Sequence, residues 1–118
     1  MQQAQTYRQR SHEYLSKALQ ELEAGDLTQA SEKGWGAAAQ MVKAVADQRG
    51  MEHYSHRSIL LAAQSIETDI GGDTATQFAF AEQLHRNFYE DTLDHAGVTM
   101  RLERVSSFVD SLERLLPA

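Results

Sequence analysis

Residues 30–57 constrain the fold more than any other part of this chain. Residues 30–46 are mostly alanine, glycine and other small residues, and they include Trp35, the only tryptophan. Because the distance between packed helices depends on the side chains between them, small residues allow close approach. The segment therefore predicts the centre of a helical packing unit. It ends in a polar loop that carries arginine and histidine side chains.

Apolar side chains recur every three to four positions along five stretches, a spacing that predicts amphipathic helices. These stretches are residues 7–22, 27–48, 59–70, 78–88 and 98–116. Glycines at positions 25, 50, 71 and 72 predict where helices end. The residues expected to cap the following helices are Asp26, Ser55, Asp73 and Asp94. The sequence leaves open whether residues 92–97 separate the last two helices.

These patterns predict an all-α fold, an antiparallel up-and-down bundle of four to five helices. A chain of 118 residues fits a single domain, which we place at residues 1–118. No alternating run of β-branched residues is long enough to predict a strand. The apolar stripes of residues 27–48 and 98–116 are wide for so small a bundle. We therefore expect one of them to pair two chains in a homodimer.

Two glycines lie inside the predicted helix of residues 27–48, where each costs about 1 kcal/mol relative to alanine. Gly34 falls on the apolar stripe, and close approach of another helix would explain it. Gly36 falls on the polar side, so we expect a second contact there, such as one with another subunit.

The composition excludes several classes of function. The chain has no cysteine, which excludes disulfides, thiolate metal sites and cysteine nucleophiles. A net charge of −6 weakens attraction to nucleic acid over the whole surface. No apolar run approaches the roughly 20 residues that span a membrane, and the first residues lack the apolar centre of a signal peptide. We therefore expect a cytoplasmic protein with no membrane association.

The loop after residue 48 contains several side chains that can bind an anion or transfer a proton. Arg49, His53, His56 and Arg57 lie close together in the sequence, with Lys43 on the preceding helix. An arginine can hold a phosphate through two hydrogen bonds, and an imidazole can act as a general acid or base near neutral pH. The start of the next helix adds free backbone N–H groups that favour an anion. These five residues are the candidate ligand site; the alternative is a solvated polar loop whose histidines cap a helix.

Two further groups are better explained by structure than by chemistry. Glu82 and His85 have the Glu-x-x-His spacing of di-iron bundles, but no second copy exists, so we expect His85 to be a core histidine. Asp91, Asp94 and His95 fit a solvated helix junction, because a divalent cation needs more ligands. We expect no metal and no cofactor.

Aromatic residues at helical spacing are expected in the core rather than on a base-stacking platform. They are Trp35, Tyr7, Tyr14, Phe78, Phe80, Phe88 and Tyr89. The sequence also contains no glycine-rich phosphate loop, no Gly-x-Ser-x-Gly turn and no His-Glu-x-x-His pair.

A set of short motifs follows one order along the chain. They are Ala30-x-x-x-x-Trp35-x-Ala37-Ala38, Val42-Lys43-Ala44, Arg49-Gly50, Ser55-His56-Arg57 and Leu84-His85-x-Asn87-Phe88-Tyr89-Glu90, followed by the apolar stripe of residues 105–116. In this order they resemble the HEPN superfamily of small helical bundles, in particular its PaREP-type branch. The resemblance implies an up-and-down bundle that pairs as a dimer.

The same resemblance implies several functions. Some HEPN proteins are ribonucleases that use an arginine and a histidine separated by a short spacer, and others are nucleotide-binding modules or partners of small nucleotidyltransferases. Arg49 and His56, with six residues between them, meet that spacing. The family motif, however, lies in the later helices, where Arg86-Asn87 resembles its start but Asp91 stands in place of the histidine.

We therefore expect a non-enzymatic, cytoplasmic, HEPN-like helical module. It would self-associate and bind a nucleotide or a partner protein such as a nucleotidyltransferase. Its polar end would be lined by Lys43, Arg49, His53, His56 and Arg57. The alternative is a metal-independent ribonuclease in which His56 is the base and Arg49 stabilises the charge on phosphorus. A purely structural assembly protein is a third reading, and RNA is not the favoured ligand.

Overall fold

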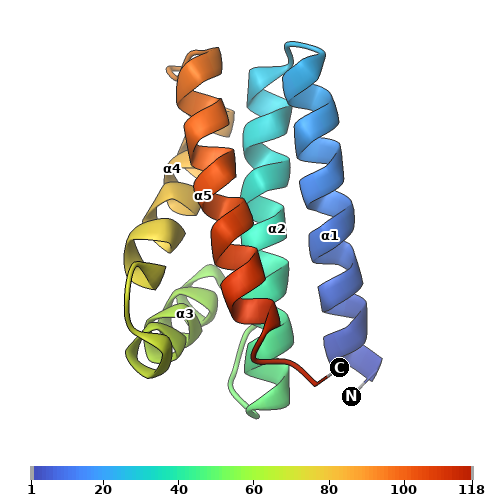
Figure 1. Cartoon of the computed structure of the whole chain (residues 1–118), viewed down its shortest axis with the longest axis vertical. Coiled ribbons are helices and arrows are strands. Elements are labelled where there is room, and N and C mark those ends of the chain that lie inside the picture. The colour runs from blue at the N-terminus through green and yellow to red at the C-terminus, as the bar shows by residue number, and fades with distance from the viewer. Residues whose placement is uncertain (1, 118) are drawn as a thin grey trace.

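The predicted helices form a five-helix bundle. The structure is a computed structural model that describes residues 2–117, and every side chain among them except those of Gln2 and Ala75. Its helices are α1 (Gln2–Glu23), α2 (Leu27–Gln48), α3 (His56–Ile70), α4 (Thr74–Glu90) and α5 (His95–Glu113), and residues 2–117 contain no strand. The long helices α1, α2, α4 and α5 run alternately up and down, and α3 lies at one end beside α2 and α4 (Figure 1). The prediction of an all-α bundle is confirmed.

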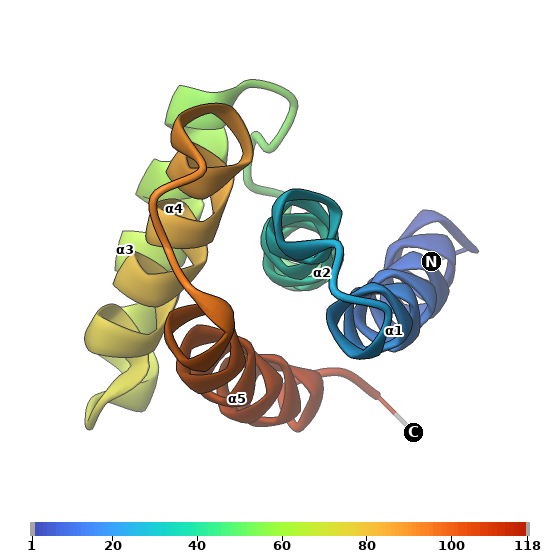
Figure 2. The same cartoon turned by 90° about the horizontal axis from the view of Figure 1, so that it is seen from above.

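Helix α2 is the centre of the bundle and contacts each of the other four helices. Seen from above, it lies between α1 on one side and α3 and α4 on the other (Figure 2). A Cβ atom on Gly34 would lie 2.5 Å from Cδ2 of Leu102 and 2.9 Å from Cδ1 of Leu84. Glycine at this position therefore lets α4 and α5 pack directly on the α2 backbone, as the sequence predicted.

The wide apolar stripes of α2 and α5 are covered inside the chain. Met41, Val42 and Val45 are at most 1% exposed because the other helices of the chain pack against α2. The buried residues of α5 are Val98, Leu102, Val105, Phe108, Val109 and Leu112. Contacts within one chain thus account for the width of both stripes, on which the expected homodimer rested. The homodimer itself stays a prediction.

The helix ends follow local capping chemistry at most of the predicted positions. Asp26 accepts a hydrogen bond from the backbone N–H of Gln29 at 3.3 Å, and Ser55 caps α3 through a reciprocal pair of hydrogen bonds with Ser58. Asp73 is the N-cap of α4, as predicted, but its side chain makes no cap hydrogen bond. The Oγ1 of Thr74 donates to the carbonyl of Gly71 at 3.0 Å.

The question left open at residues 92–97 is settled by a break between α4 and α5. Asp91 ends α4 in the left-handed conformation with φ 51°, and Asp94 begins α5 by accepting from the N–H of Gly97 at 2.8 Å. The break is fastened by Asn87, which is 2% exposed. Its Oδ1 accepts from the N–H groups of Thr92 at 2.8 Å and Leu93 at 2.9 Å. Its amide also donates to Ser31 Oγ at 3.0 Å, so the junction is tied to α2.

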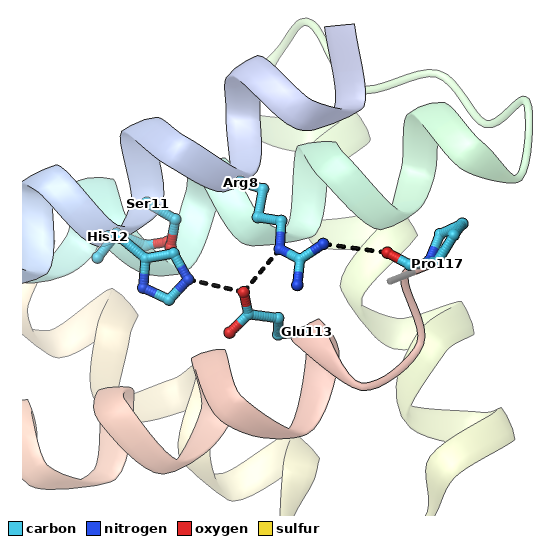
Figure 3. A network of polar contacts seen from close by, with 6 residues as sticks. Arg8, Ser11, His12, Glu113 and Pro117 are labelled. Carbon is cyan, nitrogen blue, oxygen red and sulfur yellow. Dashed lines mark hydrogen bonds and ion pairs between the residues drawn. The ribbon is translucent and has the colours of Figure 1, made fainter. Parts of the chain in front are cut away.

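The C-terminal end of α5 is joined to α1 by a polar network that we call the Glu113 network: Arg8, His12, Glu113 and the carbonyl of Pro117 (Figure 3). Arg8 Nε and His12 Nε2 each lie 2.7 Å from Oε2 of Glu113. Arg8 also donates to the Pro117 carbonyl at 3.1 Å. Burial acts to raise the pKa of Glu113, but the hydrogen bonds and charges of His12 and Arg8 outweigh it and lower the pKa.

None of the described helices has the combination of length and apolar composition that crossing a membrane requires.

Candidate functional site

A cavity of about 440 Å³ opens on the surface where α2 meets α1, α3 and α4. Its wall along α2 alternates charged, aromatic and small side chains, because residues three and four apart share one helix face. The lining residues are Tyr14, Glu32, Lys33, Trp35, Gly36, Ala39, Gln40, Lys43, Tyr54, Ser55, His56, Ile59 and His85. Four segments distant in the sequence therefore contribute to one concave surface.

Three aromatic rings form the centre of this site. The Trp35 ring lies 5.2 Å from that of His56 and 4.8 Å from that of His85, and the two imidazole centroids are 5.7 Å apart. The interplanar angles are 24°, 28° and 25°, so the three rings are nearly parallel. They come from α2, α3 and α4, and the cluster joins all three helices.

Each imidazole also faces a carboxylate from another helix. His85 Nδ1 lies 3.1 Å from Oε1 of Glu32, and His56 Nε2 lies 3.6 Å from Oε1 of Glu82. Glu32 precedes Trp35 by three residues on α2, and Glu82 precedes His85 by three on α4. We call Glu32, Trp35, His56, Glu82 and His85 the cavity cluster. No group of three or more His, Asp or Glu side chains in the described part of the chain is placed to hold a metal ion.

Positive charge reaches the cavity from two directions. Lys43 lines its wall, and its Nζ lies 5.7 Å from the centre of the Tyr7 ring. Ser55 and His56 also line the cavity, where α3 begins. The first N–H groups of a helix have no intrahelical partner, and they favour an anion. Lys43, the imidazoles and the first turn of α3 can therefore act together on a negatively charged group.

Gly36 lies against Tyr14 of α1. A Cβ atom at this position would lie 3.2 Å from Cδ2 of Tyr14. The Tyr14 ring thus rests on the α2 backbone and forms one wall of the cavity. The predicted second contact exists, and it is made inside the chain.

The structure brings together two of the five candidate site residues. Lys43 and His56 line the cavity. Arg49 pairs with Asp69 of α3 and is not among the lining residues. Arg57 is exposed and also lies outside the lining. Arg49 fastens the end of α2 to α3, which is a structural role.

His53 is a buried histidine rather than part of the cavity wall. It is 3% exposed, and its Nδ1 lies 2.7 Å from the carbonyl of Met51. Its ring packs edge-on to Tyr7, with centroids 5.5 Å apart, and under Tyr54 at 4.4 Å. It supports the loop from beneath, and Tyr54 above it reaches the cavity.

The expectation that His85 is a core histidine was wrong. Its side chain is 30% exposed, because the pair with Glu32 and the stack on Trp35 hold it at the cavity wall. Tyr89, one turn further along α4, was expected in the core and is 72% exposed. Phe78 is 3% exposed and confirms the core assignment at its position.

The sequence contained a signal for the residues that were missed. Glu32 with Trp35 and Glu82 with His85 have the spacing of neighbours on one helix face. That spacing places a carboxylate and an aromatic ring side by side on one face of α2 and on one face of α4. It does not say that the faces meet, because their meeting depends on how α2 and α4 pack.

Fold and cavity together define a small all-helical bundle with a polar and aromatic surface cavity. The chain belongs to the archaeal PaREP1/PaREP8 family, whose model matches residues 6–109. Its fold is similar to the crystal structure of a protein from Sulfolobus solfataricus, with a TM-score of 0.83 and 21% identity, covering 92% of this chain and 97% of that one. At this identity the likeness shows the fold alone. No curated protein matches the chain.

The PaREP part of the resemblance is thereby confirmed. Membership of the wider HEPN superfamily stays a prediction.

Proposed function

We propose that this protein is a non-enzymatic, HEPN-like helical module that binds a nucleotide in the cavity between α2, α3 and α4. The observation that supports it is a cavity of about 440 Å³ in which His56 and His85 stack on Trp35 and whose wall also includes Lys43. Small-molecule sites are commonly concave, with aromatic walls and a few polar groups that converge. A nucleotide needs both an apolar surface for its base and positive groups for its phosphate.

The two parts of such a ligand have separate places in the cavity. Tyr14 and Tyr54 offer ring surface to a base, and Lys43 with the first turn of α3 offers positive charge to a phosphate. Gln40 also lines the cavity, and its Oε1 is buried without a hydrogen-bond partner. A buried unpaired acceptor is unfavourable, so a ligand amino group that reached it would gain affinity.

The test is a titration of the protein with AMP and ATP, followed by the fluorescence of Trp35. Lys43→Ala should weaken binding by about tenfold, because it removes a charge-assisted contact. Arg49→Ala is the matched control: it also removes one positive charge near the loop, but Arg49 already pairs with Asp69. The proposal fails if neither nucleotide binds, or if the two variants weaken binding equally.

The proposal includes self-association, a cytoplasmic location and a protein partner such as a nucleotidyltransferase, which rest on the composition and on the HEPN resemblance. Because the wide stripes of α2 and α5 are covered, a homodimer would have to use other surfaces. Light scattering across a concentration series tests self-association. A single monomeric mass at all concentrations would remove it.

One observation favours a second candidate, a metal-independent ribonuclease. The imidazoles of His56 and His85 lie 5.7 Å apart, and Lys43 lines the same cavity. One imidazole can accept a proton and the other donate one, while a cation stabilises the charge on phosphorus. Arg49 lies outside this cavity, so Lys43, rather than Arg49, would stabilise the charge on phosphorus. Incubation with transfer RNA tests this candidate: cleavage that survives both His56→Ala and His85→Ala rules it out.

A further inference from the structure

The two imidazoles of the cavity each face a carboxylate from a neighbouring helix, at 3.1 Å for His85 and Glu32 and at 3.6 Å for His56 and Glu82. The imidazole centroids are 5.7 Å apart, so both pairs belong to one electrostatic unit. We propose that anion binding in this cavity is coupled to proton uptake by His56 and His85. The inference rests on the proposed nucleotide site and adds how pH regulates it.

The charges around the imidazoles come from every helix packed against them. Helix α2 supplies Glu32 and Lys43, and α4 supplies Glu82. Glu21 of α1 balances Lys33, whose Nζ lies 3.2 Å from its Oε1. The other titratable or charged neighbours are phenols and exposed residues on the same elements: Tyr14, Tyr54, Arg57, Arg86 and Tyr89.

Protonation of the imidazoles decides the sign of the net charge of the two carboxylates, Lys43 and the two rings. With both rings neutral, two carboxylates oppose the single charge of Lys43, and the unit repels an anion. With both rings protonated, the balance becomes positive. An anion bound here therefore favours the imidazolium forms, and by linkage each proton taken up makes affinity depend on pH.

The pH range of the effect follows from the side chain involved. Imidazole is the group whose charge ordinarily changes between about pH 5 and pH 8. Once the phosphate of the ligand is fully ionised, affinity should therefore fall as the pH rises, by up to about tenfold per pH unit for each proton taken up. A site built from lysine and backbone N–H groups alone would show no such dependence.

The experiment is calorimetric titration of the whole protein with AMP at pH 7.5, in two buffers that differ in ionisation enthalpy. At this pH the phosphate of AMP is almost fully ionised, since its second pKa is about 6. We expect a net uptake of about one proton per AMP bound. We also expect affinity to be about tenfold higher at pH 7 than at pH 8.5.

Two variants assign the protons to the cavity. His85→Gln keeps a polar side chain of similar reach and should reduce the proton uptake to about half or less. His12→Gln is the matched control, because His12 also pairs with a glutamate, Glu113, but belongs to the α1–α5 side of the bundle. It should leave the uptake unchanged.

A third variant keeps the inference testable if His85→Gln binds nothing. Glu32→Gln removes the carboxylate that opposes the anion and leaves both imidazoles in place. It should raise the affinity for AMP at pH 8.5 several-fold. An affinity at pH 8.5 equal to that of the wild type would overturn the inference.

The outcomes separate this inference from the proposed function. Binding of AMP without proton uptake would overturn the coupling and leave the nucleotide site standing. No binding at pH 7 or pH 8.5 would remove the nucleotide site and the coupling with it. The inference would also be overturned if His12→Gln reduced the proton uptake and His85→Gln left it unchanged.

Discussion

The Glu113 network and the cavity cluster are built from the same residue types but have different surroundings. In the Glu113 network, one carboxylate oxygen accepts from both Arg8 and His12, and Arg8 also reaches the chain end at Pro117 (Figure 3). In the cavity cluster, two carboxylates face two imidazoles that stack on Trp35 beside an open cavity.

The difference teaches how to separate structural from functional polar groups in this bundle. An arginine beside Glu113 supplies a permanent positive charge, so that carboxylate is satisfied whatever the histidine does. The carboxylates of the cavity cluster face imidazoles, which carry a positive charge only when they are protonated. We therefore expect the Glu113 network to affect stability and the cavity cluster to affect binding.

The largest expected effect concerns two residues of α4 that lie two positions apart. Asn87→Ala leaves the N–H groups of Thr92 and Leu93 without their acceptor and removes the hydrogen bond that Ser31 Oγ accepts. It should lower the free energy of unfolding by about 2–3 kcal/mol. His85→Ala loses the ring contact with Trp35 and the partly exposed pair with Glu32, and should cost about 1 kcal/mol. Urea unfolding measures both changes. Equal losses of unfolding free energy would contradict the separation into structural and functional polar groups.

A smaller effect is expected in the Glu113 network. Glu113→Gln should lower the free energy of unfolding by about 1 kcal/mol at pH 7, because the pair is partly exposed. The affinity for AMP should not change. Glu82→Gln should show the opposite pattern. It should lower the free energy of unfolding by at most about 0.5 kcal/mol and alter the affinity for AMP. A binding defect in Glu113→Gln would break the comparison.

The pH dependence of stability sharpens the same contrast. The folded-state pKa of Glu113 lies below its ordinary value of 4.5, so its contribution is fully present above the unfolded pKa and is lost as the pH falls through the folded one. The stability difference between wild type and Glu113→Gln should therefore shrink on acidification from pH 7 to pH 3. Urea unfolding at both values measures it, and a constant difference would show that the charge of Glu113 is not its source.

The smallest effect is expected at the cavity wall. Gly36→Ala gains up to about 1 kcal/mol in helix propensity, but its Cβ would lie 3.2 Å from Cδ2 of Tyr14 and must displace that ring slightly. The net change in the free energy of unfolding should be within about 0.5 kcal/mol. Because Tyr14 lines the cavity, the affinity for AMP should change more than stability does. The opposite ranking would mean that Tyr14 serves packing alone.

The helix ends that carry a cap or a glycine could be predicted because these signals are local, whereas the start of α1 at Gln2 and the end of α5 at Glu113 were not predicted. Helix α2 runs from Leu27 to Gln48, as predicted, because Asp26 caps its start and the chain turns at Gly50. Ser55 and Asp94 begin α3 and α5 for the same kind of reason. Asp73 shows the limit: it stands at the predicted N-cap of α4, but its side chain makes no hydrogen bond to the first turn.

The candidate site was predicted only where sequence neighbours also became spatial neighbours. Lys43 and His56 reached the cavity, whereas Arg49 turned to Asp69 and His53 went beneath Tyr54. Proximity along the chain does not determine side-chain direction once a loop has folded against a helix.

By itself, the sequence determined five amphipathic helices, their capped ends and the close approach at Gly34, because periodicity, capping and residue size act over a few residues. Tertiary structure alone decided that Glu32 and Trp35 of α2 meet His85 of α4, and that His56 of α3 joins them. The physical reason is that the site is made by the packing of three helix faces. The angle and depth of that packing come from the whole core rather than from any one segment.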